Sequence, residues 1–226
     1  MKTLCTAGLS AECTLWTMTE PRAHLSMLRS YTAADALTIA NASCGTISLF
    51  LCLDYVETDS NRYIWVAFLL LPMALVFDIL DGWVARAQPH RKSVLGGDLD
   101  SLADVISFGV APAALGFTLG MRGGWDMVCL TYFVVCGVSR LARFNVTAAA
   151  LSDASTGKVK YFEGTPIPTS IVIVAVLGVA FFLGAVDGSL WFGEYQVGPA
   201  LLHPLALIYA ASGSAMISAT LRIPKP

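Results

Sequence analysis

Six long stretches of the chain contain no aspartate, glutamate, lysine or arginine, and the charged positions fall between them. The stretches are 36–53, 63–77, 105–121, 127–139, 164–186 and 195–221. Because a bilayer core of about 30 Å takes about 20 mostly apolar helical residues to cross, this pattern predicts six membrane-spanning helices. We place them at about 34–54, 63–86, 97–121, 125–147, 167–187 and 199–221, within one membrane domain over 32–222.

The segment 1–31 has no such apolar stretch. Residues 21–35 mix apolar side chains with Arg22, His24 and Arg29, which fits either an interfacial amphipathic helix or a tail that leads into the first span. We interpret 1–31 as an N-terminal cytoplasmic or interfacial segment. The expected fold class is therefore an all-α integral membrane protein, with six transmembrane helices plus an N-terminal interfacial helix.

Composition agrees with lipid as the solvent. Of the 226 residues, 56% are hydrophobic and only 13% are charged, whereas a soluble domain carries about twice that share of charge. The mean hydropathy is +0.67. A formal net charge of −2 provides no basic surface for nucleic acid, so we expect membrane lipids, and no nucleic acid, as partners.

The basic residues are distributed unevenly about the six spans. Arg62 and Arg122 fall on one side of the membrane, and the other twelve of the fourteen fall on the opposite side. Those twelve are Lys2, Arg22, Arg29, Arg86, Arg91, Lys92, Arg140, Arg143, Lys158, Lys160, Arg222 and Lys225. Because cytoplasmic loops of membrane proteins are enriched in lysine and arginine, we expect both termini in the cytoplasm.

Three of the predicted spans are too short or marginal unless they extend into charged sequence. They then take in Asp78 and Asp81, Asp100 and Asp104, and Arg140 and Arg143, all toward the cytoplasmic side. Ionisable residues at membrane depth are expensive and usually face a protein-lined cavity, so they mark a functional site. A cation or proton path through a small transporter is the alternative interpretation.

Helical periodicity brings the four aspartates together. At about 100° per residue, Asp78 and Asp81 share one helix face, and Asp100 and Asp104 share a face of the next helix. A short turn joins the two helices, so we expect antiparallel neighbours whose carboxylates converge on one pocket. No lysine lies in either stripe, and carboxylate oxygens suit Mg²⁺ or Mn²⁺, with two ions able to clamp a phosphate.

From Asp78 to Asp104 the chain reads DILDGWVARAQPHRKSVLGGDLDSLAD. This run resembles the signature DxxDGxxARx8GxxxDxxxD of the CDP-alcohol phosphotransferase family and matches every fixed residue type. It departs from the pattern in having nine residues, rather than eight, between Arg86 and Gly96. The extra residue falls in the turn that contains Pro89, so each half keeps its own helical register. The resemblance implies the fold of that family, with a six-helix core, and a homodimer.

Three further segments indicate a branch of the family. DSLADVISFGVAPA (100–113), SRLARFNV (139–146) and YFEGTPIP (161–168) resemble the members that transfer a phosphatidyl group from CDP-diacylglycerol to L-serine and release CMP. The segment 26–45 is similar to the fungal-type eukaryotic members, which implies the endoplasmic reticulum membrane; a bacterial source would imply the cell membrane. Inositol or glycerol 3-phosphate as the acceptor is the alternative within the family.

The resemblance also implies roles for individual residues. Asp78, Asp81, Asp100 and Asp104 would hold two metal ions, and Asp104 would also be the base that accepts the proton of the serine hydroxyl. The expected contacts of the CDP-lipid are Gly82, Ala85, Arg86, Gly96 and Ser107. Close helix packing is the alternative for Gly82 and Ala85, and an ordinary charge at a helix end is the alternative for Arg86.

The fourth span carries two arginines that could bind an anion. Arg140 and Arg143 are one helical turn apart and share a face, which suits the serine carboxylate or a lipid phosphate, and Phe144 follows them directly. The resemblance implies that this segment forms the site of the acceptor serine. Snorkelling of both arginines to lipid headgroups is the alternative. We expect the loop 161–168 to fold back over the site. His203, next to Pro204, is expected to mark a kink with a hydrogen-bonded imidazole rather than a ligand.

Overall fold

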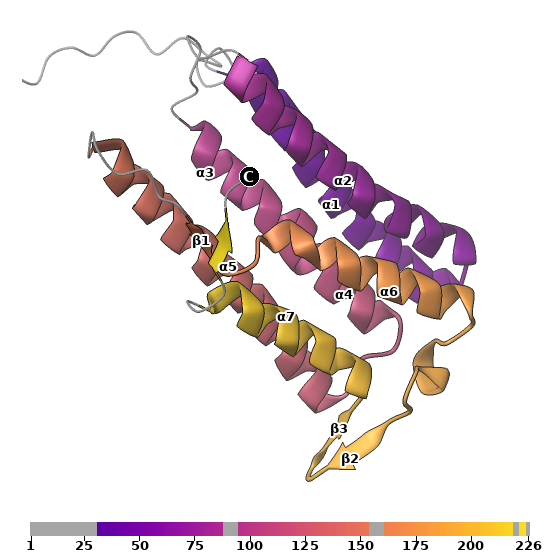
Figure 1. Cartoon of the computed structure of the whole chain (residues 1–226). Helices are drawn as coiled ribbons and strands as arrows, with labels where there is room; N and C mark the ends of the chain where they lie inside the picture. Colours follow the sequence, from indigo (N-terminus) through magenta and orange to yellow (C-terminus); the bar gives the residue numbers. More distant parts are fainter. Residues whose placement is uncertain (1–30, 88–94, 154–160, 219–221, 225–226) are drawn as a thin grey trace, which may run out of the picture. The chain divides into compact units, whose positions relative to one another are not determined.

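The computed structural model describes residues 31–87, 95–153, 161–218 and 222–224 of the chain, with side chains over 31–87, 95–146 and 164–218. The predicted interfacial helix lies outside the described residues. From Thr32 onward the chain forms one compact unit, and Figure 1 shows that this unit is built mainly from helices.

The first two helices form an antiparallel pair. Helix α1 (Ala33–Thr58) begins at a capping box, in which Asp35 Oδ2 accepts the Thr32 N–H at 2.7 Å and Thr32 Oγ1 accepts the Asp35 N–H at 3.3 Å. Helix α2 (Asn61–Ala87) follows after Asp59, which takes a left-handed conformation with φ 52°. Because a two-residue connection leaves no room for the chain to move away, the two helices lie side by side along their length (Figure 1).

The third span is one helix with an irregular centre. It consists of α3 (Gly96–Asp104), the π-helical segment η2 (Val105–Val110) and α4 (Ala111–Thr118). Within η2 the Ala111 N–H bonds to the carbonyl of Ile106, five residues back. Pro112 lacks an N–H, and in a regular helix its ring would collide with the carbonyl four residues earlier, so the wider turn accommodates this proline. A π turn inside a helix is frequently found at a functional site.

The remaining helices are α5 (Gly124–Asp153), α6 (Ile171–Phe182) and α7 (Leu207–Ile217), of which the last two are extended by the 3₁₀ turns η3 (Ile167–Ser170) and η5 (Pro204–Ala206). Among the described residues, four segments are long and apolar enough to cross a membrane: Ala33–Thr58, Asn61–Ala87, Gly96–Thr118 and Gly124–Val146. Ile167–Phe182 and Pro204–Ile217 are apolar but shorter, so the last two predicted spans, 167–187 and 199–221, are both shorter in the structure.

The expectation of an all-α chain needs a correction, because four strands of three residues are present. Strand β1 (Tyr161–Glu163) pairs antiparallel with β4 (Arg222–Pro224), and β2 (Tyr195–Val197) pairs antiparallel with β3 (Ala200–Leu202). A positive φ of 62° at Gly198 allows the two-residue turn of the β2–β3 hairpin. This hairpin, with the 3₁₀ turn η4 (Asp187–Ser189), occupies the sequence between α6 and α7.

Large apolar side chains fill the interior and also cover much of the outside. Tyr209 of α7 is fully buried, donates its hydroxyl to the carbonyl of Pro112 at 2.6 Å, and lies edge-on to Phe133. Outside, Leu69 is 64% exposed and Phe182 is 75% exposed. Exposed apolar side chains over several helices fit a surface that faces lipid rather than water, as the composition predicts.

His203 joins the start of the last helical segment to α5. The imidazole Nδ1 of His203 lies 2.6 Å from Asp126 Oδ2, and the main-chain N–H of His203 donates to Asp126 Oδ1 at 2.7 Å. Asp126 Oδ2 also accepts the main-chain N–H of Gly123 at 2.9 Å. Both side chains are buried. The expectation of a hydrogen-bonded imidazole is therefore confirmed.

Candidate active site

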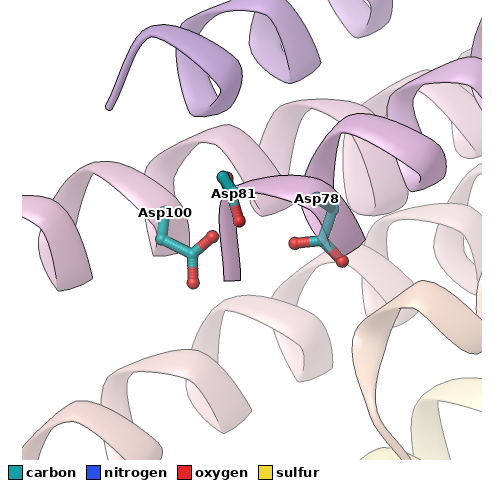
Figure 2. A group of neighbouring side chains, drawn as sticks. All are labelled: Asp78, Asp81 and Asp100. Atoms are coloured by element: carbon teal, nitrogen blue, oxygen red, sulfur yellow. The ribbon is translucent and has the colours of Figure 1, made fainter. Parts of the chain in front are cut away.

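Three of the predicted carboxylates meet between α2 and α3. One oxygen from each of Asp78, Asp81 and Asp100 lies within 4.8 Å of the other two. Asp78 and Asp81 share a face of α2 because they are three residues apart, and Asp100 lies in the first half of α3. Figure 2 shows the three side chains directed toward a common space. Asp81 is buried, and the other two are partly buried.

Asp104 lies one turn beyond Asp100 and is as buried as Asp81, since each has an exposed fraction of 6%. Its Oδ1 accepts a long hydrogen bond of 3.4 Å from Nδ2 of Asn41 on α1. The carboxyl group of Asp104 is also close enough to the carboxyl group of Asp78 for the two to interact. The structure therefore places Asp104 beside the group of three, although only the other three form the compact set that could hold a metal ion.

This cluster concentrates negative charge. Three carboxylates have oxygens within 4.8 Å of one another, and Asp104 lies beside them. Several carboxylates so close together repel one another unless cations or protons compensate them. Three oxygen donors within one ion's reach are the ligand type that Mg²⁺ and Mn²⁺ prefer. The donor set therefore fits a divalent cation.

The residues predicted to contact a CDP-lipid differ in their surroundings. At Gly82 no described atom lies within 4 Å of the position that a Cβ would take, so this glycine is not explained by close packing against another described helix. Ala85 and Arg86 are exposed in the last turns of α2, and Gly96 is half-buried at the start of α3. An open surface thus continues from Asp81 along α2.

Ser107 lies in a different environment from the other four. It is fully buried in η2, and its hydroxyl donates to the main-chain carbonyl of Asn41 at 2.9 Å. Gly45 of α1 faces it so closely that a Cβ there would lie 2.5 Å from Ser107 Oγ. The contact of Ser107 with a CDP-lipid stays a prediction, and the observed contacts show that it packs η2 against α1.

A cavity of about 380 Å³ opens beside the aspartates, between α3, α5 and η3. Asp100, Asp104 and Ser101 line its α3 side, and Pro166 and Pro168 close it from the segment 161–168. The predicted return of that segment over the site is therefore confirmed. The α5 side is lined by Arg140, Leu141, Phe144 and Asn145.

The two predicted serine-binding arginines are not equivalent. Arg140 lines the cavity, and its Nε is buried with no hydrogen-bond partner among the described residues. Arg143 is exposed and does not line the cavity. Phe144 lines it, and the neighbouring Asn145 accepts a hydrogen bond from Ser101 at 3.1 Å. Arg140 thus faces the carboxylates of Asp98, Asp100 and Asp104 across one cavity.

Sequence reasoning missed the contribution of α1. Thr38 donates its hydroxyl to Asp81 Oδ2 at 2.6 Å, and Asn41 donates to Asp104. The available signal was a set of polar residues three apart, Asp35, Thr38 and Asn41, in an otherwise apolar span. That spacing places them on one face, next to the helices that carry the aspartates.

The fold and the site define an integral membrane protein with an acidic, cation-compatible cluster beside a cavity that Arg140 lines. The chain belongs to the CDP-alcohol phosphatidyltransferase family, whose sequence profile matches residues 31–210. The motif-based resemblance to this family is therefore confirmed.

Individual relatives indicate which branch of the family the chain resembles. The chain is 44% identical over 207 residues to the CDP-diacylglycerol–serine O-phosphatidyltransferase of Saccharomyces cerevisiae, covering 90% of this chain and 74% of the yeast protein. It is 38% identical over 144 residues to the archaetidylserine synthase of Methanothermobacter thermautotrophicus, covering 62% and 55%. For the serine phosphatidyltransferase of Helicobacter pylori strain 26695, the identity is 33% over 151 residues, covering 65% and 56%. The chain thus spans little more than half of these last two relatives.

Proposed function

We propose that this protein is a phosphatidylserine synthase, which transfers the phosphatidyl group of CDP-diacylglycerol to the hydroxyl of L-serine and releases CMP. The 44% identity to the yeast enzyme over 90% of this chain is the observation that carries the proposal. The cavity supports it, because a small acceptor with a carboxylate and an ammonium group fits between Arg140 on one wall and Asp100 and Asp104 on the other.

In the proposed reaction the serine oxygen attacks the phosphorus that bears the diacylglycerol, in line with the leaving CMP. The new oxygen–phosphorus bond forms as the bond to CMP breaks, and Asp104 accepts the hydroxyl proton. Direct transfer is supported by the surroundings of Ser107, which lies three residues after Asp104. It is fully buried and bonded to the Asn41 carbonyl, so it is poorly placed as a nucleophile.

The metal set in this proposal is Asp78, Asp81 and Asp100, with Asp104 at its edge. A bound divalent cation would neutralise charge on the diphosphate and on the departing CMP. Helices α2 and α3 would hold the aspartates, and thereby the cation, in place. In this proposal Gly82 and Ala85 leave space for the cytidine moiety, and Arg86 near the end of α2 and Gly96 at the start of α3 contact the phosphates.

Acceptor specificity tests the proposal most directly. In detergent-solubilised full-length protein with CDP-diacylglycerol and Mn²⁺ or Mg²⁺, L-serine is expected to stimulate CMP release by at least about tenfold over inositol, glycerol 3-phosphate or no acceptor, since a site that pairs with a specific polar group rejects analogues that leave its own groups unpaired. The measurement is CMP release with each alcohol in turn. Stimulation by inositol or glycerol 3-phosphate, and not by serine, would reassign the acceptor.

The arginine of the cavity provides a second test. Arg140→Gln is expected to raise the KM for serine by about 10- to 100-fold with a smaller change in kcat, because a hydrogen bond to a charged group contributes about 1.5–3 kcal/mol. Arg122→Gln is the matched control, since Arg122 is an exposed arginine near Asp187, outside the cavity. An unchanged KM in Arg140→Gln would remove Arg140 from the serine site.

We further propose a homodimer whose active sites face the cytoplasm, in the endoplasmic reticulum membrane if the source is eukaryotic. The distribution of basic residues supports this orientation, with twelve of fourteen on the side where the aspartates lie. Membership of the family supports the dimer.

A further inference from the structure

Helix α1 contributes no ligand to the acidic cluster, yet it presents a polar face to it. Its buried positions include Asp35, Thr38, Asn41, Gly45 and Ser48. The opposite face is exposed and apolar, with side chains such as Ile47 and Phe50. Polar side chains at membrane depth are unfavourable unless they find partners or serve a function, so the partners of this face indicate its role.

Thr38 contacts Asp81 through a short hydrogen bond. Its hydroxyl lies 2.6 Å from Asp81 Oδ2 and 3.1 Å from the main-chain carbonyl of Ala34. A hydroxyl has a single hydrogen to donate, and a charged acceptor at the shorter distance binds it more strongly. This hydrogen bond restrains the rotamer of the Asp81 side chain and occupies one lone pair of Oδ2.

Asn41 is held more rigidly than an ordinary helix residue. It is fully buried, and its own carbonyl accepts the hydroxyl of Ser107 at 2.9 Å. The close approach of Gly45 to Ser107 shows that α1 and η2 are tightly packed at this point. The Asn41 Nδ2 group is thereby fixed at 3.4 Å from Asp104 Oδ1, while its Oδ1 has no described partner.

We propose that α1 braces the site from behind, with Thr38 as the positioning residue for Asp81 and Asn41 as the positioning residue for Asp104. The inference deepens the proposed function and rests on it. Thr38 acts on a metal ligand, so its loss weakens cation binding. Asn41 acts on the base, so its loss slows turnover. A mere packing role for the two residues would instead change the amount of folded protein and leave both properties intact.

The Thr38 arm of the test measures Mn²⁺ binding to purified full-length protein by electron paramagnetic resonance of the free ion, without substrate. Thr38→Val removes the donor at nearly constant volume and is expected to weaken Mn²⁺ binding by about 10-fold or more, as outer partners of metal ligands commonly do. Thr38→Ser keeps the hydroxyl and is expected to restore binding. Thr46→Val is the matched control, because Thr46 donates only to the Ala42 carbonyl within its own helix.

The Asn41 arm measures CMP release per folded enzyme. Asn41→Leu and Asn41→Asp both remove the amide donor, and the second nearly preserves its size. Each is expected to lower kcat by about 10-fold or more, with a smaller change in the half-saturating Mn²⁺ concentration. If one variant does not fold, the other carries the measurement. Wild-type Mn²⁺ binding in Thr38→Val would show that Thr38 does not position Asp81. Wild-type kcat in a folded Asn41 variant would show that Asn41 does not position Asp104.

The wild-type protein separates this inference from the proposed function. Serine-dependent CMP release by the wild type, together with unaffected Thr38 and Asn41 variants, would remove the brace and leave the function standing. No CMP release with any acceptor, together with weakened Mn²⁺ binding in Thr38→Val, would remove the function and leave the Thr38 contact as support for the cation site.

Discussion

Asp104→Asn is expected to lower CMP release per folded enzyme by about 10³-fold, within the range that a positioned general base contributes. Asparagine has nearly the same shape but cannot accept the serine proton. The measurement is CMP release with saturating serine, CDP-diacylglycerol and Mn²⁺, normalised to monodisperse protein.

The position of Asp104 is the reason for expecting so large an effect. It is buried, lines the cavity together with Arg140, and accepts a hydrogen bond from Asn41, so it is placed to meet an acceptor bound in that cavity. Asp54→Asn is the matched control, since Asp54 is exposed at the far end of α1 and is expected to leave the rate unchanged. Activity of Asp104→Asn within tenfold of the wild type would exclude Asp104 as the base.

Removal of divalent cations is expected to abolish the reaction, to below about 10⁻³ of the starting rate, and addition of Mg²⁺ or Mn²⁺ to restore it. Two like charges 4.8 Å apart repel by about 3 kcal/mol at an effective dielectric of 20. Without a cation, the cluster of Asp78, Asp81 and Asp100 would therefore also repel the diphosphate of the substrate. The measurement is CMP release before and after chelation with EDTA and after back-titration with each metal.

A variant of one ligand links the chelation result to this cluster. Asp100→Asn is expected to raise the half-saturating Mn²⁺ concentration by about 10-fold or more, and the exposed Asp54→Asn again serves as the control. Full activity in excess chelator, or an unchanged Mn²⁺ requirement in Asp100→Asn, would argue against a cation held by these residues.

Much of the site could be predicted because helical periodicity determines it locally. Asp78 and Asp81 share a face of α2 by their spacing alone, and so do Asp100 and Asp104 on α3. The nine-residue interval between Arg86 and Gly96 did not disturb this, because each pair of aspartates lies within a single helix, α2 ending at Ala87 and α3 beginning at Gly96. The structure accordingly brings oxygens of Asp78, Asp81 and Asp100 within 4.8 Å of one another.

The remaining features depend on contacts between distant segments. Thr38 and Asn41 meet Asp81 and Asp104 across more than forty residues of sequence, and a threonine or asparagine in an apolar span does not indicate which helix it faces. The π turn of η2 has only Pro112 as a local signal. The pairing of β1 with β4 joins three-residue strands about sixty positions apart, and so short a strand has no hydrophobic alternation to detect.

The π turn also limits which sequence changes this span can accept in evolution. A helix with one additional residue in a turn has two angular registers, one for α3, which carries Asp100 and Asp104, and one for α4, whose Pro112 and Gly116 meet Tyr209. Deleting one residue between Val105 and Val110 would rotate one half against the other by about 100°. The face that holds the carboxylates and the face that packs on α7 would then no longer be compatible. Between Val105 and Val110, a single-residue insertion or deletion is therefore expected to disturb the protein more than a substitution that preserves side-chain size.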